Sequence, residues 1–318
     1  MRKGVMGLLY LFLLLILGIP SVDALTEQDV PIIAYPYNRK EKQTGQVALC
    51  SMIKNEASYL KEWIEFHRVI GVSHFYLFNN KSNDDYLEVL QPYIKQGVVE
   101  LFDVPFDSTL YPNPAPTHNF VQACCYNHAI RLARNCYTWL AITDSDEYIC
   151  PTQNKDLPSF LNNYIYAAGL VVYWQIYGTS NVWDLAPKEL LIEKLTYKFP
   201  NNYPANWMFK SIVQPNYALC IDPHCCVYAG DTFAVTPNHQ RFSHTPAFTD
   251  LPVDQIRIAH YYYRTARFYQ EIKRPRRLAW GFNPSESEEN YTHELSNSVY
   301  DPTMLQFVPE LRKRMFKD

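Results

Sequence analysis

The sequence predicts an α/β fold in which a mainly parallel central sheet is flanked by helices. Three observations support this class. Apolar runs of strand length alternate with segments whose apolar residues recur at the helical period. Consecutive strands separated by helices join through right-handed crossovers, which make them parallel. The chain of 318 residues, with 47% hydrophobic and 15% aromatic residues, is long enough to bury a core.

The first half of the predicted domain follows this alternation closely. The expected strands are 46–52, 74–78 and 98–102. Between them we expect a helix that ends at Gly71 and a second helix that continues to about Gln96.

A Pro-rich segment, 103–120, follows the third strand. It is longer than an ordinary connection, so we expect a loop over the sheet edge. A helix over 120–135 then leads to a strand at 138–142. Near the end of that strand we therefore look for functional side chains.

The strand at 138–142 stops abruptly at Asp144, Asp146 and Glu147. Three acids this close to a core are unfavourable unless a cation or hydrogen-bond donors neutralise them. Asp144 and Asp146 occupy alternate positions, where the chain can bring both carboxylates to one divalent cation. An ordinary solvated turn is the other interpretation of an isolated Asp-x-Asp.

Two further polar turns, 54–56 and 79–84, follow the first two strands. Ligands of open α/β sheets bind outside the carboxyl ends of the strands. Because these turns and the acidic turn 144–147 share that edge, the sequence predicts a site there.

Beyond residue 151 the pattern becomes less regular and richer in aromatic residues. The expected elements are a helix at 157–166, a strand at 170–176, a polar turn at 178–181, irregular structure with short strands to about 219, and a segment 258–264 that leads into a helix with the basic run 273–277. Aromatic side chains in such a region either bind sugar rings or fill a core.

Charge and cysteine placement restrict the remaining possibilities. The net charge is -3, which does not point to nucleic acid as a partner. Of the eight cysteines, Cys220 and Cys225 lie close to His224. A zinc site is conceivable there, but no matching ligand pair recurs, which favours a local disulfide or buried thiols. Asn80 and Asn290 begin glycosylation triplets.

Several short motifs, separated along the chain, are informative when taken in series. They are Lys54-Asn55-Glu56 with the segment Trp63 to His67, Phe75 to Asn80 with Ser82 and Asp84, Asp144-Ser145-Asp146-Glu147-Tyr148, Trp174 to Ser180, Lys210 to Val213, and His260 to Thr265 followed by Phe268 and Lys273-Arg274-Pro275-Arg276. In this order they resemble glycosyltransferase family 92, a GT-A branch related to family 2, over about residues 46–278. Tyr177 stands where the family's motif has Phe.

The resemblance implies a GT-A, Rossmann-like fold with an irregular, aromatic-rich acceptor-side half. It implies a metal-dependent, inverting transfer of a hexose onto a glycan acceptor of a glycoprotein or glycolipid. UDP-galactose is the first choice of donor by this likeness alone. The implied cofactor is Mn²⁺ or Mg²⁺, and its implied ligands are Asp144, Asp146 and His260.

The chemistry that the resemblance implies needs residues for donor binding and for catalysis, and their positions at the strand ends and turns suggest candidates. The candidates for the nucleotide sugar are Asn55, Glu56, Asn80, Asp84, Asp144 and Lys273, with Arg274 and Arg276 as further candidates for the diphosphate. Inversion requires a general base that deprotonates the acceptor hydroxyl. Asp184 is the first candidate for this base, and Glu193 and Asp231 are its competitors.

The N-terminus resembles a targeting segment, with Arg2 and Lys3 before an apolar run. We expect a signal peptide or signal anchor at 1–24, a lead-in at 25–45, the GT-A domain at 46–285 and a C-terminal tail at 286–318. The expected location is the secretory pathway, as a single-pass membrane protein with a lumenal catalytic domain in the Golgi or ER. If the segment is cleaved, the protein is secreted.

Two other classes of function remain open at this point. The first is a non-catalytic nucleotide- or carbohydrate-binding protein with the same fold. The second is a glycoside hydrolase that uses Asp144 or Glu147 as its acid, which needs a second carboxylate about 5–10 Å away and no nucleotide.

Overall fold

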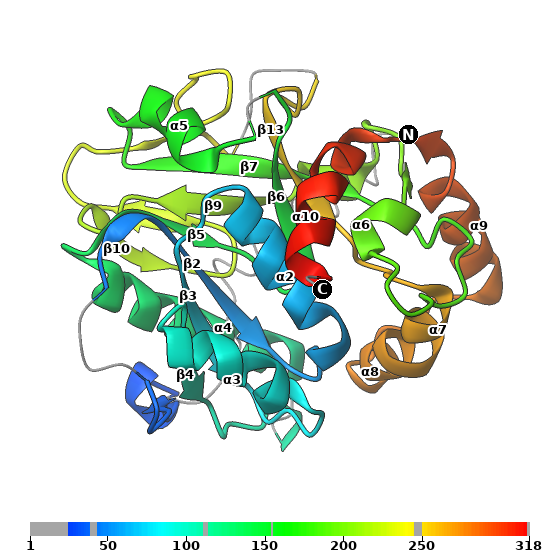
Figure 1. Ribbon diagram of the computed structural model, residues 1–318, viewed down its shortest axis with the longest axis horizontal. Helices are drawn as coiled ribbons and strands as arrows, with labels where there is room; N and C mark the ends of the chain where they lie inside the picture. The colour runs from blue at the N-terminus through cyan, green and yellow to red at the C-terminus, as the bar shows by residue number, and fades with distance from the viewer. Residues whose placement is uncertain (1–24, 39–42, 111–113, 154, 245–249, 317–318) are drawn as a thin grey trace.

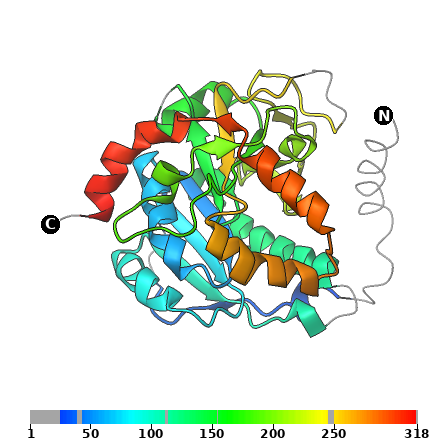
Figure 2. The same ribbon diagram turned by 90° about the vertical axis from the view of Figure 1, so that its right-hand side faces the viewer.

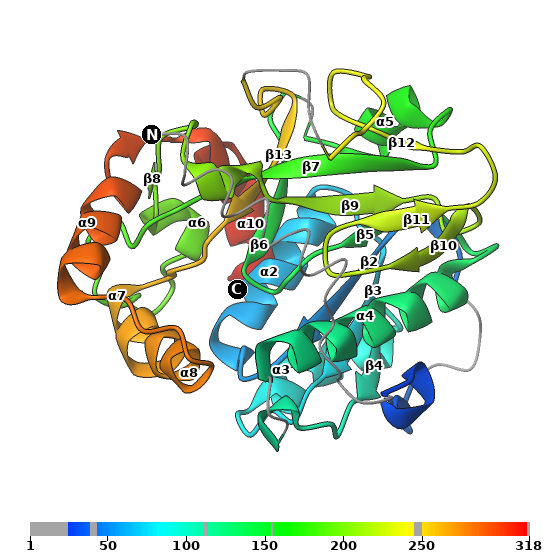
Figure 3. The ribbon, with the colours of Figure 1, turned by 180° about the vertical axis from the view of Figure 1, so that it is seen from behind.

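A ten-stranded mixed sheet crosses the molecule, and helices cover both of its faces (Figures 1 and 3). The computed structural model describes residues 25–38, 43–110, 114–153, 155–244 and 250–316. In spatial order the strands are β1 (Ile33–Ala34), β4 (Val99–Asp103), β3 (His74–Asn79), β2 (Gly45–Ile53), β5 (Tyr137–Ile142), β9 (Phe209–Val213), β7 (Gly169–Ile176), β13 (Ile256–His260) and β6 (Glu147–Pro151), and β12 (Ala234–Val235) pairs with β7.

Two parallel groups make up most of this sheet. Strands β4, β3, β2 and β5 are parallel to one another, and β7 is parallel to β13 and β12. Strand β9 runs antiparallel between the two groups, and β1 and β6 are antiparallel edge strands. The predicted mainly parallel α/β fold is therefore confirmed.

The helices and the short accessory strands complete the architecture. The helices are α2 (Ala57–Val69), α3 (Tyr86–Gln96), α4 (Pro114–Ala133), α5 (Leu157–Leu161), α6 (Leu191–Lys194), α7 (Ala266–Phe268), α8 (Arg274–Ala279), α9 (Glu286–Ser296) and α10 (Val308–Met315). Strands β10 (Ala218–Ile221) and β11 (Cys226–Tyr228) form a hairpin, and β8 (Tyr197–Lys198) pairs with β14 (Val299–Tyr300).

Alternate residues of β2 enter the cores on the two faces of the sheet. Val47 and Leu49 pack in the core that contains the α2 side chains, whereas Ala48 and Cys50 pack in the core that contains the α4 side chains. This alternation follows from the two-residue period of a strand. A strand buried on both faces is apolar nearly throughout, which explains why the sequence signal for β2 is clear.

Three elements differ from the sequence prediction. Helix α4 begins at Pro114, not near 120, because proline is tolerated in the first turn of a helix, where its missing N–H has no partner to lose. The helix predicted at 157–166 ends at Leu161 and continues as a 3-10 turn to Tyr164. Strand β6 was not predicted; it begins at Glu147 and pairs with β13.

The segment after residue 285, where the sequence indicates only a tail, contains α9, β14 and α10. Helix α10 packs against α2 (Figure 1). Met304, Phe307 and Leu311 are buried in the main core, and their spacing of three and four residues places them on one helical face. That spacing could have indicated a buried helix from the sequence alone.

The predicted domain boundaries, including the one at residue 285, stay predictions.

One expectation about localisation is corrected. In the parts of the chain that the structure describes, no helix is both long enough and apolar enough to cross a membrane. This finding contradicts the predicted single-pass membrane protein, which we withdraw. The segment 1–24, on which that prediction depended, lies outside the described residues.

Candidate functional site

The acidic turn lies between β5 and β6, at the carboxyl edge of the parallel strands. The register pairs Cys50 of β2 with Ile142 of β5 and Ile53 with Asn79 of β3, so the three predicted polar turns emerge at one edge. The backbone N–H of Asp144 donates to the Glu147 carboxylate at 2.8 Å. This contact fixes the turn that presents Asp144 and Asp146.

Four hydrogen bonds and ion contacts surround Asp144 and its neighbour Glu147. One Asp144 oxygen accepts from Gln122 at 2.6 Å and from Tyr126 at 2.9 Å, and the other lies 2.9 Å from Nζ of Lys210. Burial alone raises the pKa of Asp144, but Lys210 outweighs it and holds the pKa below its usual value. Burial raises the pKa of Glu147 well above its usual value, although Lys210 lies 3.8 Å away.

Asp146 faces a different set of partners. Its Oδ2 lies 2.6 Å from Nζ of Lys273, and its Oδ1 lies 3.4 Å from Nε2 of His260 at the end of β13. Burial opposes ionisation here too, but Lys273 and His260 together lower the pKa of Asp146 well below its usual value. The Tyr261 N–H donates to the Asp146 carbonyl at 2.8 Å, which ties the turn to β13.

The predicted metal ligands are only partly brought together. Across the described residues, no group of three or more His, Cys, Asp and Glu side chains could hold a metal ion by itself. Asp146 and His260 do lie side by side, and burial lowers the pKa of His260, which favours the neutral imidazole that a metal requires. Both oxygens of Asp144 are already occupied by donors. Asp146 and His260 are therefore the two predicted ligands that the structure leaves side by side, and a carboxylate with an imidazole is a donor set that a divalent transition metal accepts.

The candidates for the nucleotide side connect the first two polar turns. The Asn55 side chain accepts from the Asn83 N–H at 2.9 Å, and Asp84 accepts from the Ala57 N–H at 2.8 Å at the start of α2. Asn55 has φ of 57°, a left-handed conformation that asparagine tolerates. The pair of turns is thus held as one unit beside the acidic turn.

Two other candidates on this side are engaged internally. Glu56 is buried against Arg264, whose Nη2 also donates to the Ser145 carbonyl at 3.2 Å. Asn80 is buried and donates to the carbonyls of Val104 and Phe106 at 3.1 and 2.8 Å. These two residues therefore stabilise the loops at the carboxyl edge of the sheet. The Asn80 triplet is also unavailable for glycosylation while its amide is buried, whereas Asn290 is exposed on α9.

The cationic residues that were predicted to bind the diphosphate lie in different surroundings. Lys273 contacts Asp146, as described, whereas Arg274 pairs with Glu289 of α9 at 2.8 Å. Arg276 and Lys54 lie near His118 of α4: burial, with the positive charges of Arg276 and Lys54, lowers the pKa of His118 to about 4. Within the described ranges neither Arg276 nor Lys54 forms an ion pair, so both are available to an anion.

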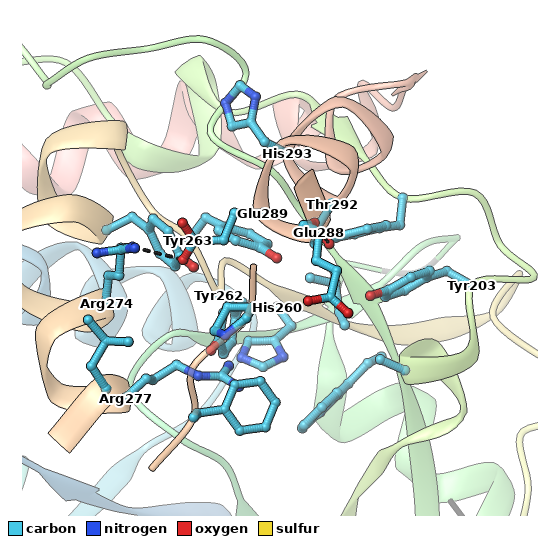
Figure 4. A pocket seen from close by; sticks show the side chains of 18 residues that line it. Tyr203, His260, Tyr262, Tyr263, Arg274, Arg277, Glu288, Glu289, Thr292 and His293 are labelled. Atoms are coloured by element: carbon cyan, nitrogen blue, oxygen red, sulfur yellow. Dashed lines mark hydrogen bonds and ion pairs between the residues drawn. The ribbon is translucent and has the colours of Figure 1, made fainter. Parts of the chain in front are cut away.

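A pocket of about 470 Å³ lies on the other side of His260 (Figure 4). Its walls are largely aromatic and come from the end of β7, the 3-10 turn Pro204–Trp207, the end of β13, α8 and α9; they are Trp174, Ile176, Phe199, Tyr203, Ala205, His260, Tyr262, Tyr263, Tyr269, Arg274, Arg277, Leu278, Phe282, Pro284, Glu288, Glu289, Thr292 and His293. Figure 2 shows α8 and α9 next to each other on this side.

Helix α9 is held in place by the small-residue turn after β7. A Cβ added to Gly178 would lie 2.4 Å from the Ser296 carbonyl, so glycine is required for this close approach. Asn297 accepts from the Ser180 N–H at 2.6 Å, and Thr179 lies 3.3 Å from Nε2 of His293. The predicted polar turn at 178–181 therefore supports a wall of the pocket.

The predicted general bases lie outside the lining of this pocket. Asp184 is on an exposed loop, with 41% of its side chain accessible, and pairs with Arg267 at 2.8 Å. Glu193 pairs with Arg312 at 2.5 Å, and Asp231 is exposed in a turn. The carboxylates that do line the pocket are Glu288 and Glu289, from the segment that the sequence analysis treated as a tail.

Among the residues that the structure describes, the cysteine cluster forms no metal site. The eight cysteines are free, and Cys225 lies 3.6 Å from Nε2 of His244. His224 instead contacts the Phe209 carbonyl through Nδ1 at 2.9 Å. Tyr177, the departure from the family's motif, is buried against Tyr261 at a ring distance of 4.8 Å. That substitution therefore falls in the core.

The sequence did not indicate that Lys210 is one of the charges that balance the acidic turn. Lys210 is fully buried in β9 between Asp144 and Glu147, and its motif was noted without a role. A lysine within an apolar strand is itself a signal, because such a residue is rarely buried unless paired. Tyr126 and Gln122 gave no such signal, since their contact with Asp144 depends on how α4 crosses the sheet.

Comparisons with known proteins agree on one family. The sequence model of glycosyltransferase family 92 matches residues 46–296. A family 92 protein of Oryza sativa subsp. japonica is 28% identical over 141 residues, 42% of this chain and 22% of that protein. One of Ricinus communis is 28% identical over 143 residues, 45% of this chain and 22% of that protein. The chain thus spans about a fifth of the length of these relatives.

Solved structures are more distant. The S. aureus TarS 1-349 structure in complex with UDP is 14% identical, with a TM-score of 0.35, over 54% of this chain and 47% of that one. Glucosyl-3-phosphoglycerate synthase from Mycobacterium tuberculosis is 11% identical, with a TM-score of 0.26, over 41% of this chain and 44% of that one. On the match to most of its length, this chain belongs to glycosyltransferase family 92.

Proposed function

We propose that this protein is a metal-dependent, inverting hexosyltransferase that uses a nucleotide-sugar donor. The observation that carries the proposal is the position of Asp146. It lies at the carboxyl edge of the sheet between Lys273 and His260, and His260 also lines the aromatic pocket. A donor at the edge and an acceptor in the pocket would meet at this point.

The diphosphate of the donor would lie near the cations at the edge. Arg276 and Lys54 have no ion pair among the described residues, and they lie near His118 and the acidic turn. Cations at this place stabilise the negative charge that develops on the leaving group. Asn55 and Asp84, on the turns after β2 and β3, are the proposed neighbours of the nucleoside.

The residues at Asp146 fit a divalent ion. Asp146 and His260 would hold Mn²⁺ or Mg²⁺, which would supply charge neutralisation to the departing diphosphate. Gln122, Tyr126 and Lys210 hold Asp144 in place, where it could accept hydrogen bonds from the ribose. Glu147 stabilises the turn and takes no part in proton transfer in this scheme.

Transfer forms one bond and breaks one. The acceptor hydroxyl oxygen attacks the anomeric carbon, and the bond from that carbon to the donor phosphate oxygen breaks, with its electron pair leaving on the diphosphate. The acceptor proton passes to a carboxylate base on the opposite face. Asp184 is the base proposed from the sequence; Glu288, which lines the pocket, is the alternative favoured by position.

The donor sugar is proposed as galactose from UDP-galactose, and the acceptor as a glycan. The support for galactose is the family likeness. The aromatic lining of the pocket supports a sugar acceptor, because aromatic faces pack against sugar rings.

The test measures UDP release from a panel of UDP-sugars with and without Mn²⁺, for the parent and for Asp146→Ala. Asp254→Ala, at an exposed aspartate before β13, is the matched control. We expect Mn²⁺-dependent release in the parent and the control, with a loss of about 100-fold or more in Asp146→Ala. Binding of UDP-sugar without release would identify a non-catalytic protein. Sugar release from glycosides without nucleotide would identify a hydrolase.

A further inference from the structure

The aromatic pocket contains Arg277, which forms no ion pair with any carboxylate of the described residues. Cζ of Arg277 lies 3.9 Å from the ring centroid of Phe282 and 5.3 Å from that of Tyr262. In the described part of the chain its guanidinium makes no hydrogen bond or ion pair, and its nitrogens are not among the buried unpartnered atoms. Its N–H groups can therefore be reached from the pocket.

The other charged side chains of the pocket are already engaged. Arg274 and Glu289 pair at 2.8 Å. Oε2 of Glu288 accepts from the N–H and the hydroxyl of Ser285, at 2.8 and 2.7 Å, at the start of α9. The N-terminal end of a helix favours a negative charge, so Glu288 is stabilised without Arg277.

Arg277 belongs to the pocket side of α8, not to the edge side. Arg276, one residue earlier, stacks near Trp280 at 5.7 Å, and Trp280 contacts His118 of α4. Tyr262 contacts both Arg277 and Lys273, and Nζ of Lys273 lies 3.6 Å from the Tyr262 centroid. Figure 4 shows Tyr262 and His260 between Arg277 on one side and Tyr203 on the other.

A flat apolar surface lies opposite Arg277. Phe199 and Tyr203 stack with centroids 3.9 Å apart, and both line the pocket. Burial raises the pKa of Tyr203, and the charge of Arg277 opposes that rise, which places the two side chains within electrostatic reach. An aromatic platform beside a forked cation suits a ring that carries an anionic group.

We propose that this pocket binds the acceptor and that the acceptor's sugar is acidic, with its carboxylate held by Arg277. The inference rests on the proposed function in one respect, which is that the bound sugar is the acceptor of the transfer. A guanidinium binds a carboxylate through two parallel hydrogen bonds, which a neutral sugar cannot replace. Because His260 lines the pocket and also contacts Asp146, only this side chain would lie between the bound ring and Asp146.

The experiment measures binding of three probes by calorimetry: p-nitrophenyl β-glucuronide, p-nitrophenyl β-glucoside and UDP. The proteins are the full chain, Arg277→Gln, Arg277→Lys and Arg276→Gln. We expect the parent to bind the glucuronide about tenfold more tightly than the glucoside. Arg277→Gln should remove that preference and leave UDP affinity unchanged. Arg276→Gln should weaken UDP and keep the preference.

Several results would overturn the inference. They are an equal affinity of the parent for both glycosides, binding of neither, a preference that survives Arg277→Gln, or a loss of UDP affinity in Arg277→Gln, which would assign Arg277 to the donor. If Arg277→Gln does not fold, as judged by circular dichroism, Arg277→Lys carries the test: it should weaken the glucuronide alone, because lysine lacks the fork. Failure of the parent to bind UDP is a separate result and contradicts the proposed function.

Discussion

Asp144 and Asp146 are two positions apart in the sequence, yet they have different partners. Gln122, Tyr126 and Lys210 donate to the two oxygens of Asp144. Asp146 instead lies between two groups, Lys273 and His260, that come from the C-terminal half. At the scale of the residue this difference favours Asp146 over Asp144 as the proposed metal ligand, because Asp146 lies beside His260, a second side chain that could bind a metal.

Lys210→Met tests whether Lys210 supports the acidic turn in addition to stabilising the core. Removing this buried amine leaves Asp144 and Glu147 without their cation, and we expect unfolding to require about 3 kcal/mol less free energy and UDP release to fall. Lys198 is a matched control because it is also buried, bonded to Gln175 at 2.7 Å. Lys198→Met should lower the melting temperature and preserve UDP release. Equal losses of activity in both variants would contradict a specific role for Lys210.

The two candidate bases are distinguished by Asp184→Asn and Glu288→Gln. A general base contributes about 100-fold or more to kcat, so the variant that removes it should lose that factor with little change in donor KM. From the position of Glu288 in the pocket we expect the loss in Glu288→Gln. A loss confined to Asp184→Asn would instead support the base proposed from the sequence.

His67 should make stability depend on pH. Burial lowers its pKa from 6.5 to about 3, and its ring accepts from the Ile149 N–H at 3.2 Å. As the pH falls below the unfolded value, the unfolded chain binds a proton that the folded protein does not. Stability from this group is therefore full above that value and falls by about 1.4 kcal/mol per pH unit towards the folded pKa.

The measurement is urea denaturation over this pH range. His67→Gln should flatten the slope, and His293→Gln, at an exposed histidine of α9, should leave it unchanged. An unchanged slope in His67→Gln would show that other groups dominate the acid sensitivity.

At the scale of the element, helices α8 and α9 build the pocket, although each is short. Successive residues of α8, Arg276 and Arg277, face the sheet edge and the pocket respectively. Helix α9 depends on the turn after β7, where Gly178 allows the Ser296 carbonyl to approach. A substitution in that turn should therefore displace α9 and alter the wall of the pocket that α9 forms.

Leu311→Ala tests whether α10 is an integral element. Leu311 is 0% exposed in the main core against α2, so its truncation should lower the free energy of unfolding by about 3 kcal/mol. Leu110, which is 81% exposed, is the matched control, and Leu110→Ala should stay within about 0.5 kcal/mol of the parent. Chemical denaturation checks both. Equal stabilities would mean that α10 packs too loosely to matter.

At the scale of the whole molecule, the parallel strands β2, β3 and β5 position one half of the site and β7 and β13 position the other. The antiparallel strand β9 joins these groups and supplies Lys210 beneath the acidic turn. Both halves are needed, because Asp146 comes from the first and His260 from the second.

Binding of UDP and Mn²⁺ should be coupled. In the proposed site, Asp146 and His260 would leave most of the coordination sphere of a metal to phosphate oxygens, so Mn²⁺ and UDP together should raise the melting temperature by more than the sum of their separate effects. Thermal denaturation with each ligand alone and with both measures this, and Asp146→Ala should abolish the excess. A full shift with Mn²⁺ alone would contradict a shared site.

The local signals were strong wherever a segment is buried on both faces or ends in polar residues. Strands β2, β3, β4, β5 and β7 match their predicted ranges to within one residue at each end. Helix α4 and strand β6 did not, since proline at a helix start and a short edge strand have weak local patterns. The acidic turn was found because carboxylates directly after an apolar strand are unusual.

By itself, the sequence determined the α/β class, the order of the main elements and the edge where the acidic turn lies, because apolar periodicity and strand ends are local properties of the chain. Only the tertiary structure decided which carboxylate faces which cation, that α9 and α10 join the domain, and that Arg277 faces the pocket with no hydrogen-bond or ion-pair partner among the described residues. These are contacts between segments far apart in the chain. Their geometry depends on how whole helices and strands pack, which no local pattern records.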